Sequence, residues 1–305
     1  MHIPDGFLTT PVWASLAAIS LPSAGAFARK AQSGLEDGRV PLMGFMGAFV
    51  FAAQMINFPV GIGTSGHLIG SALLAATLGP AAAVVVMTAI LTIQALIFQD
   101  GGLLALGANV FNMAIAGVLA GYWPYRAFAG AKTGKGGMIG LFAGGFLSVI
   151  VSAALCLGEL ALSGVRMPAE VLGVSAAVFS ITGLLEGLIT VAVIGTLTRM
   201  NPRWIPQPAG EGRRALALLG CAALLLASVG FLLASTLPDG LERVAGLVGL
   251  AGREHAVLPA PLPDYETLAI DNPWLRKAAA GLLGLGVTSL ACFLLGKWIS
   301  RWRSA

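Results

Sequence analysis

Long apolar runs follow one another along almost the whole chain, separated by short polar segments. Most of them approach the roughly 20 residues that a helix needs to cross a bilayer. Because the runs are continuously apolar instead of alternating, they predict transmembrane helices and not the strands of a membrane barrel. The sequence predicts nine spans, from runs near residues 9–28, 41–58, 67–79, 81–98, 103–123, 137–160, 171–198, 215–235 and 276–297.

Two of these runs, 67–79 and 81–98, are short, and Gly79-Pro80 separates them. Proline does not continue a helix, because it lacks a backbone N–H and its ring clashes with the preceding turn. The two runs are therefore expected to form short helices around a bend, or a partly re-entrant pair.

The composition agrees with a membrane environment. Of the 305 residues, 57% are hydrophobic and only 10% are charged, whereas a soluble domain carries about 25% charged residues. The 41 glycines suit helices that pack closely in lipid. We therefore expect an all-α, multi-pass integral membrane protein.

The basic residues predict the orientation of the chain. Nine spans with the N-terminus outside and the C-terminus inside put all the main basic clusters in the cytoplasm, as the positive-inside rule requires. The net charge of +4 then reports topology, and no nucleic-acid partner is expected. The clusters are Arg29, Lys30 and Arg39; Arg126, Lys132 and Lys135; Arg199, Arg203, Arg213 and Arg214; and Lys297, Arg301 and Arg303.

The chain divides into two parts joined by a linker. Residues 1–200 form a unit of seven predicted helices, and the Pro/Gly-rich segment 201–212 is a cytoplasmic linker. Residues 213–305 form a transmembrane helical hairpin, whose long, acidic outer loop covers residues 236–273.

The first two residues, Met1 and His2, form a candidate metal chelator. A free terminal amine, the His2 amide nitrogen and the His2 Nδ1 atom bind one metal through a five-membered and a six-membered ring. Planar nitrogen sites of this kind are typical of Ni(II) and Cu(II). The ligands have to lose their protons, so binding should weaken in acid. The alternative is a second-residue histidine without a role.

His67 strengthens the metal hypothesis. The chain has only three histidines, and the expected topology puts His67 on the same side of the membrane as His2. His67 ends a glycine-rich loop at a helix start, and an imidazole at membrane depth is usually functional. It is a candidate fourth nitrogen ligand, or a histidine that is hydrogen-bonded at a helix start. The third histidine, His255, lies in the outer loop and is expected to be solvated.

Other motifs exclude some functions. Residues 61–66 match GxGxxG, but their flanks are membrane helices and not the strand and helix of a dinucleotide site. Residues 130–136 fail the Walker pattern, so the chain itself is not expected to bind ATP through it. No nucleophile–base pair stands out, which predicts a transport protein and not an enzyme, with no organic cofactor. Cys156, Cys221 and Cys292 lie in apolar runs and are expected to be buried.

Several polar and small residues are candidates for supporting roles. Glu186 lies in the middle of a span, where a carboxylate is either functional or paired with polar neighbours. Asp5 is expected to hold the N-terminal segment or the outer nitrogen of His2, and Ser65 and Asn57 are further candidates for orienting the ligands. Ala14 and Ala18 form a small-residue pair that suits close helix docking.

Two stretches of the sequence resemble a known family. Residues 1–8 (Met-His-Ile-Pro-Asp-Gly-Phe-Leu) and residues 63–68 (Gly-Thr-Ser-Gly-His-Leu) resemble the substrate-binding M component of nickel/cobalt energy-coupling-factor transporters. Residues 238–242 (Pro-Asp-Gly-Leu-Glu), on the predicted hairpin, resemble the N component of the same systems. The chain thus resembles a fused M–N protein.

The resemblance implies a ligand set and partners. In the family, the terminal amine, the second residue's amide and imidazole, and a loop histidine hold the metal, and these correspond to Met1, His2 and His67. A small-residue face on the first helix, matched best by Ala14 and Ala18, docks a transmembrane coupling subunit, which connects to two cytoplasmic ATPase subunits. The Ile-Pro-Asp-Gly opening and the fused arrangement favour the nickel branch.

The sequence therefore predicts a high-affinity subunit that captures Ni(II) for ATP-driven import. Two alternatives stay open. One is the same role for Co(II), and the other is a secondary transporter that is driven by an ion gradient and uses Glu186 as a proton relay. The hairpin 213–305 is expected to control access or release of the metal.

Overall fold

The fold is described from a computed structural model, which covers residues 1–35, 37–61, 63–128, 135–200, 213–232, 234–267 and 269–301. The predicted linker 201–212 lies outside the described residues, as do Lys132, Arg203 and Arg303.

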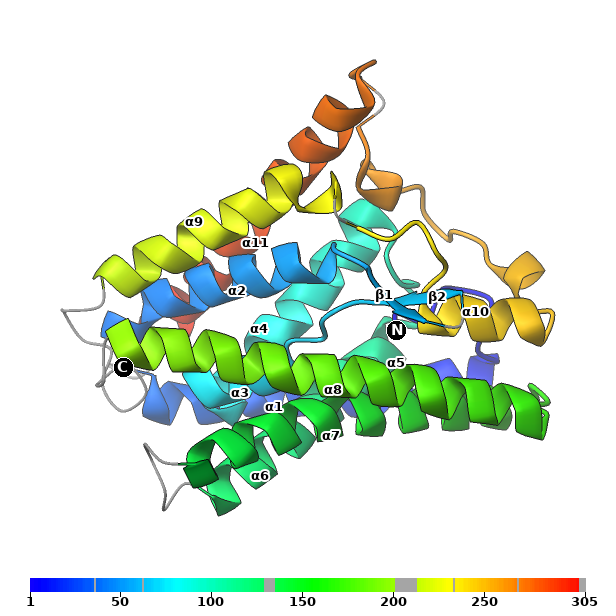
Figure 1. The fold of residues 1–305 in the computed structure, drawn as a ribbon, viewed down its shortest axis with the longest axis horizontal. Coiled ribbons are helices and arrows are strands. Elements are labelled where there is room, and N and C mark those ends of the chain that lie inside the picture. The colour runs from blue at the N-terminus through cyan, green and yellow to red at the C-terminus, as the bar shows by residue number, and fades with distance from the viewer. Residues whose placement is uncertain are drawn as a thin grey trace.

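Helices dominate the described chain, and one short β-hairpin interrupts them (Figure 1). The strands β1 (Phe58–Gly61) and β2 (Thr64–Gly66) pair antiparallel. The helices of the first part are α1 (Thr10–Gly34), α2 (Val40–Gln54), α3 (Ser71–Leu78), α4 (Pro80–Ile93), α5 (Leu106–Asn109), α6 (Gly117–Ala127), α7 (Lys135–Leu162) and α8 (Ala169–Met200). Those of the second part are α9 (Arg213–Val229), α10 (Gly240–Leu247) and α11 (Pro273–Arg301). The π-helical turns η2 (Gln94–Phe98) and η3 (Val110–Ala116) continue α4 and α5.

The prediction of an all-α integral membrane protein is confirmed. Among the described residues, seven helices are long and apolar enough to cross a membrane. They are Thr10–Gly34, Pro80–Phe98, Leu106–Ala127, Gly136–Leu162, Ala169–Met200, Arg214–Leu232 and Pro273–Arg301. The count of nine spans and the outside position of the N-terminus stay predictions.

The two short runs form helices around a bend, as one of the two interpretations predicted. Helix α3 has eight residues, a length of about 12 Å, which does not cross a hydrocarbon core of about 30 Å. Gly79, with φ of 79°, ends α3, and Pro80 begins α4. The run 67–79 is therefore only partly helical, because its first residues form a loop and not a helical turn.

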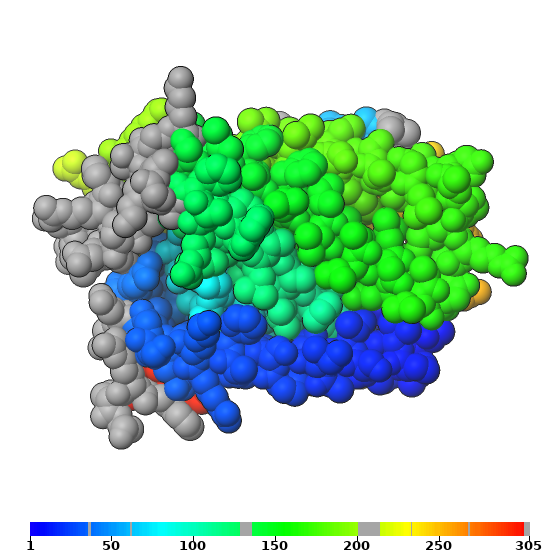
Figure 2. All heavy atoms as spheres, turned by 90° about the horizontal axis from the view of Figure 1, so that it is seen from below, coloured from blue at the N-terminus to red at the C-terminus, as the bar shows by residue number. Residues whose placement is uncertain are grey.

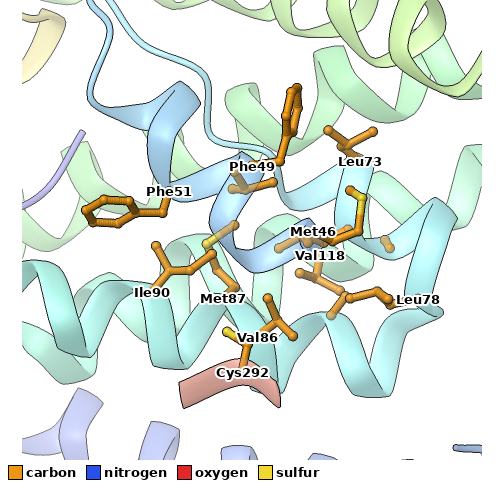
Figure 3. Packing of buried hydrophobic residues seen from close by; sticks show 14 of the residues in the cluster. Met46, Phe49, Phe51, Leu73, Leu78, Val86, Met87, Ile90, Val118 and Cys292 are labelled. Carbon is orange, nitrogen blue, oxygen red and sulfur yellow. The ribbon is translucent and has the colours of Figure 1, made fainter. Parts of the chain in front are cut away.

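The packed interior lies between α2, α4 and α11. Met46 and Phe51 of α2 belong to the same buried cluster as the α4 side chains Val86, Met87 and Ile90, and Cys292 of α11 lies beside Val86 (Figure 3). Helices α9 and α11 both pack along α2, so the C-terminal hairpin is continuous with this core. Cys156 and Cys292 are buried, but the expectation for Cys221 was wrong, because this side chain is exposed on α9.

Helix α1 lies at the surface of the helical unit. It forms a continuous band along one side of the molecule (Figure 2), and only Ser20 and Ala31 of this helix are buried. Its close contact with the rest of the chain is at Gly107, where an added Cβ would stand 2.4 Å from the Ala17 Cα. Ala14 is half-buried and Ala18 is exposed, so docking of a partner on this pair stays a prediction.

Candidate metal site

The N-terminal segment is folded into the molecule. Ile3 is fully buried, and Met1 is 7% exposed. The Ile3 amide donates to the Asn109 side-chain oxygen at 2.8 Å, and the Asn109 amide nitrogen donates to the Ile3 carbonyl at 3.0 Å. The Asn109 side chain thus pairs with both backbone polar groups of Ile3. This pairing fixes the backbone at residue 3 and so determines where Met1 and His2 lie.

Asp5 anchors the same segment to the start of α5. Its carboxylate accepts hydrogen bonds from the backbone amides of Leu103, Leu104 and Ala105, at 2.8 to 3.2 Å. Free amides at a helix start favour a negative charge. An added Cβ at Gly102 would stand 2.1 Å from the Asp5 Oδ1, so this approach requires glycine. Of the two roles expected for Asp5, these contacts correspond to holding the segment.

Met1 and His67 meet inside the molecule. The Met1 nitrogen lies 2.6 Å from the His67 Nε2 atom, and the His67 Nδ1 lies 3.0 Å from the Leu68 carbonyl oxygen. Because a carbonyl only accepts, Nδ1 carries the hydrogen and Nε2 offers its lone pair to the terminus. Burial, followed by the charges of the terminal amine and His2, lowers the pKa of His67 to about 3. His67 is therefore neutral at physiological pH, as a metal ligand has to be.

The His2 ring stacks on the His67 ring, with centroids 5.3 Å apart and planes 8° from parallel. The His2 Nδ1 atom lies 2.9 Å from the Asp100 Oδ1, and the buried Nε2 atom has no hydrogen-bond partner. Asp100 also accepts the hydroxyl hydrogen of Tyr265. Burial opposes the ionisation of Asp100, but the contacts with His2 and Tyr265 hold its pKa below the ordinary value.

Asp239 brings the C-terminal hairpin to the same point. Its Oδ2 atom lies 2.9 Å from the Met1 nitrogen and 3.8 Å from the His67 Nε2. Its Oδ1 accepts from the Glu242 amide and caps α10, while the Glu242 carboxylate accepts from the Asp239 amide. Burial opposes ionisation, but the terminal amine and His67 lower the pKa of Asp239 to about 2. Figure 1 shows the N-terminus beside β1, β2 and α10.

The loop before His67 is shaped by glycine and held by the hairpin. Gly61 and Gly63 have positive φ angles of 88° and 66°, which side chains other than glycine rarely adopt. The Ser65 amide donates to the Pro238 carbonyl at 2.8 Å, and its hydroxyl donates to the Leu237 carbonyl at 2.7 Å. The Asn57 carbonyl accepts from the Ser235 amide at 2.7 Å. These contacts of Ser65 and Asn57 hold residues 235–238 against the loop.

Glu186 holds the other side of the His67 loop. Its two carboxylate oxygens accept hydrogen bonds from the amides of Ile69 and Gly70, each at 2.7 Å. These amides precede α3, so the carboxylate caps the start of this helix. Of the two readings of Glu186, this geometry corresponds to pairing with polar neighbours.

A cavity of about 530 Å³ adjoins the two histidines. Both parts of the chain line it, and five carboxylates face it: Asp100, Asp239, Glu242, Glu254 and Asp264. Lys277 is the cation among its described lining residues. The cavity thus extends from His2 and His67 to the acidic loop of the C-terminal hairpin. The negative charge of its lining favours cations.

Sequence reasoning did not identify Asp239 or Asp100 as neighbours of Met1 and His2. It considered Asn109 for orienting the ligands, but favoured hydrogen bonding between helices. The Pro-Asp-Gly-Leu-Glu motif contains Asp239, but from the sequence it indicated only a resemblance to a family and no contact with the N-terminus. Among the described residues, no group of three or more His, Cys, Asp or Glu side chains is placed to hold a metal ion.

Two family models match this chain. The family model of the cobalt uptake substrate-specific transmembrane region, CbiM, matches residues 2–204. The PDGLE domain matches residues 213–301. A putative fused nickel transport protein NikMN of Archaeoglobus fulgidus is 34% identical, over 98% of this chain and 99% of its own length. The fused nickel transport protein NikMN of Rhodobacter capsulatus is 29% identical, over 94% of each chain.

A solved structure supports the fold of the first part. The crystal structure of a truncated transition metal transporter has 35% sequence identity and a TM-score of 0.55, and the match covers 65% of this chain and 99% of the other. Fold and site together define a multi-pass membrane protein with its N-terminus folded into a polar corner. The chain belongs to the CbiM family, in the fused M–N form that carries a PDGLE domain.

Proposed function

We propose that this protein captures Ni(II) at its N-terminus for import. The ligands are the Met1 amine, the His2 amide nitrogen and imidazole, and the His67 Nε2. One observation carries the proposal: the Met1 nitrogen lies 2.6 Å from the His67 Nε2 in a buried corner. Two nitrogens at neighbouring corners of a square plane, each about 2.0 Å from the metal, lie about 2.8 Å apart.

Three further features support this ligand set. His67 is neutral and directs its lone pair at the terminus. The His2 ring is stacked on the His67 ring, so the two imidazoles lie next to each other beside the terminal amine. The relatives that match almost the whole chain are named as nickel transport proteins, while the family description and other relatives name cobalt. Nickel is therefore the favoured ion, and cobalt the alternative.

We also propose that transport is driven by ATP hydrolysis on partner subunits. The partners are a transmembrane coupling subunit, which docks on α1 near Ala14 and Ala18, and two cytoplasmic ATPase subunits. The open face of α1 supports this docking (Figure 2). An ion-gradient transporter with Glu186 as a relay is less favoured, because both oxygens of Glu186 accept backbone hydrogen bonds.

Metal analysis of the purified protein tests the proposal. Protein with Met1 as its verified first residue should retain about one Ni(II) per chain, in preference to Co(II) when both are offered. An extension of two or more residues before Met1, or His2→Ala, should abolish this binding, because the extension moves the free amine out of reach of the chelate and the substitution removes the imidazole ligand. His255→Ala is the matched control, since the side chain of this exposed histidine hydrogen-bonds to the Arg253 carbonyl. Retention of nickel by the extended protein would rule out the terminal site.

Uptake assays test the roles of the partners and the hairpin. Cells with the full chain should accumulate nickel only when coupling and ATPase subunits are present. Accumulation without them, driven by an ion gradient, would favour the secondary transporter. Removal of residues 213–305 should lower uptake and leave some binding in the first part, and unchanged uptake would contradict control of metal access by the hairpin.

A further inference from the structure

Asp100 joins the first residues of the chain to the outer loop of the hairpin. Its carboxylate faces the His2 Nδ1 at 2.9 Å and accepts the hydroxyl of Tyr265. His2 belongs to the N-terminal segment, and Tyr265 lies 165 residues away from Asp100 along the chain. One carboxylate therefore links the proposed ligand to the part of the protein that resembles a separate subunit.

Aromatic and backbone contacts hold Tyr265 in the position from which its hydroxyl reaches Asp100. The Tyr265 ring stacks on Phe98, with centroids 4.6 Å apart and planes 16° from parallel, and lies 6.1 Å from the Phe51 ring. The Leu262 amide donates to the Ile97 carbonyl at 2.9 Å. The contacts with Phe98 and Ile97 are with the π-helical turn η2, an element that often marks functional sites.

The backbone around this contact is held in an unfavourable conformation. In the described part of the chain, the non-glycine residues with positive φ are Gln99 at 58°, Asp264 at 54° and Tyr265 at 58°. All three flank or form the contact between Asp100 and Tyr265. Residues other than glycine rarely adopt positive φ angles. Where they do, the surrounding contacts hold the backbone in this conformation, commonly at binding sites and switches.

The contact engages the atom that the metal needs. The proposed chelate uses the His2 Nδ1, but this nitrogen faces Asp100, while the Nε2 has no partner. One nitrogen does not face a carboxylate and a metal at the same time. We infer that Asp100, oriented by Tyr265, is a positioning residue that competes with the metal for the His2 Nδ1, so capture requires His2 to leave Asp100.

This inference rests on the proposed terminal site and adds a role for the hairpin. When only a fraction of the protein molecules is in the conformation that binds the ligand, the measured affinity is reduced in proportion to that fraction. Through Tyr265, the outer loop sets this fraction for the metal-free protein. The contact is absent once the metal is bound, so it changes the rate of capture and not the rate at which bound metal leaves.

The test measures Ni(II) binding by the full chain with its native Met1. Stopped-flow absorbance gives the association and dissociation rates, and equilibrium titration with a nickel salt gives Kd. Asp100→Asn should raise the association rate about tenfold and lower Kd by the same factor, with an unchanged dissociation rate. Tyr265→Phe keeps the ring stack and should shift the rate about threefold in the same direction. Asp271→Asn is the control in the same loop and should leave both rates unchanged, because this side chain is exposed.

A purely structural role for Asp100 would weaken binding or speed dissociation, and either result would overturn the inference. Tyr265→Phe decides the matter if Asp100→Asn does not fold. If binding survives an N-terminal extension, the terminal site fails and this inference fails with it. If the extension abolishes binding and neither variant speeds association, the site stands and only the role of Asp100 is wrong.

Discussion

The Met1 nitrogen lies 2.6 Å from the His67 Nε2, although 66 positions separate the two residues in the sequence. Asn109 and Asp5 hold the segment on one side of this contact, and Glu186 holds the loop on the other. The Asp239 carboxylate completes the corner from the C-terminal hairpin.

Asp5→Asn should weaken both the fold of the N-terminal segment and nickel binding. The carboxylate accepts three backbone hydrogen bonds, and hydrogen bonds to charged groups contribute about 1.5–3 kcal/mol each. The amide retains one acceptor oxygen, so we expect a loss of about 2 kcal/mol and nickel binding at least tenfold weaker. Thermal unfolding in detergent and equilibrium titration measure the two effects. Asp271→Asn, an exposed change in the outer loop, should alter neither.

Glu186→Gln should reduce nickel affinity without abolishing transport. One carboxylate oxygen is replaced by an NH₂ group, which faces a backbone amide that also donates, and the expected cost is about 2 kcal/mol. The loop that carries His67 is then held less firmly. Nickel titration and uptake with the partner subunits provide the measurement, with Glu170→Gln at the exposed start of α8 as the control. Normal binding with complete loss of uptake would instead indicate a proton relay.

Gly144→Ala should destabilise the contact between α6 and α7. An added Cβ would stand 2.3 Å from the Gly121 carbonyl oxygen, and a backbone atom does not move aside as a side chain does. Overpacking of this kind costs about 1–3 kcal/mol, so the midpoint of thermal unfolding should fall. Gly158→Ala lies on the same helix with nothing within 4 Å of the added atom, and it should leave the midpoint unchanged or raise it. Equal midpoints for the two variants would contradict the packing.

Nickel affinity should fall as the pH falls, and His67 should not be the cause above about pH 4. The pKa of His67 is about 3, so this imidazole takes up no proton when the pH drops from 8 to 6. The amine and the amide do release protons when they bind the metal, so affinity should fall about 10- to 100-fold per pH unit. Titrations at pH 6, 7 and 8 measure this slope. His67→Ala should weaken binding at every pH with the same slope, and a shallower slope would assign a proton to His67.

The sequence by itself determined the class of protein. Continuous apolar runs, with few charges to cover a water-facing surface, leave transmembrane helices as the stable arrangement, and the long helices α7, α8 and α11 correspond to three of these runs. Periodicity does not distinguish a helix from the loop that precedes it. The run 67–79 therefore included residues 67–70, which lie in the loop before α3. Apolar character also does not tell a buried face from one that meets lipid, which is why Cys221 was misplaced.

For the site, the sequence supplied chemistry and the tertiary structure supplied partners. Met1, His2 and His67 were candidates because amine, amide and imidazole nitrogens are ligands of one metal at any such terminus. Asp239 and Asp100 were not candidates, because a lone carboxylate carries no signal until its neighbours are known. The contact between Met1 and Asp239 spans 238 positions, and that between Asp100 and Tyr265 spans 165. Contacts over such separations depend on how the helices and the outer loop pack, and only the folded chain decides them.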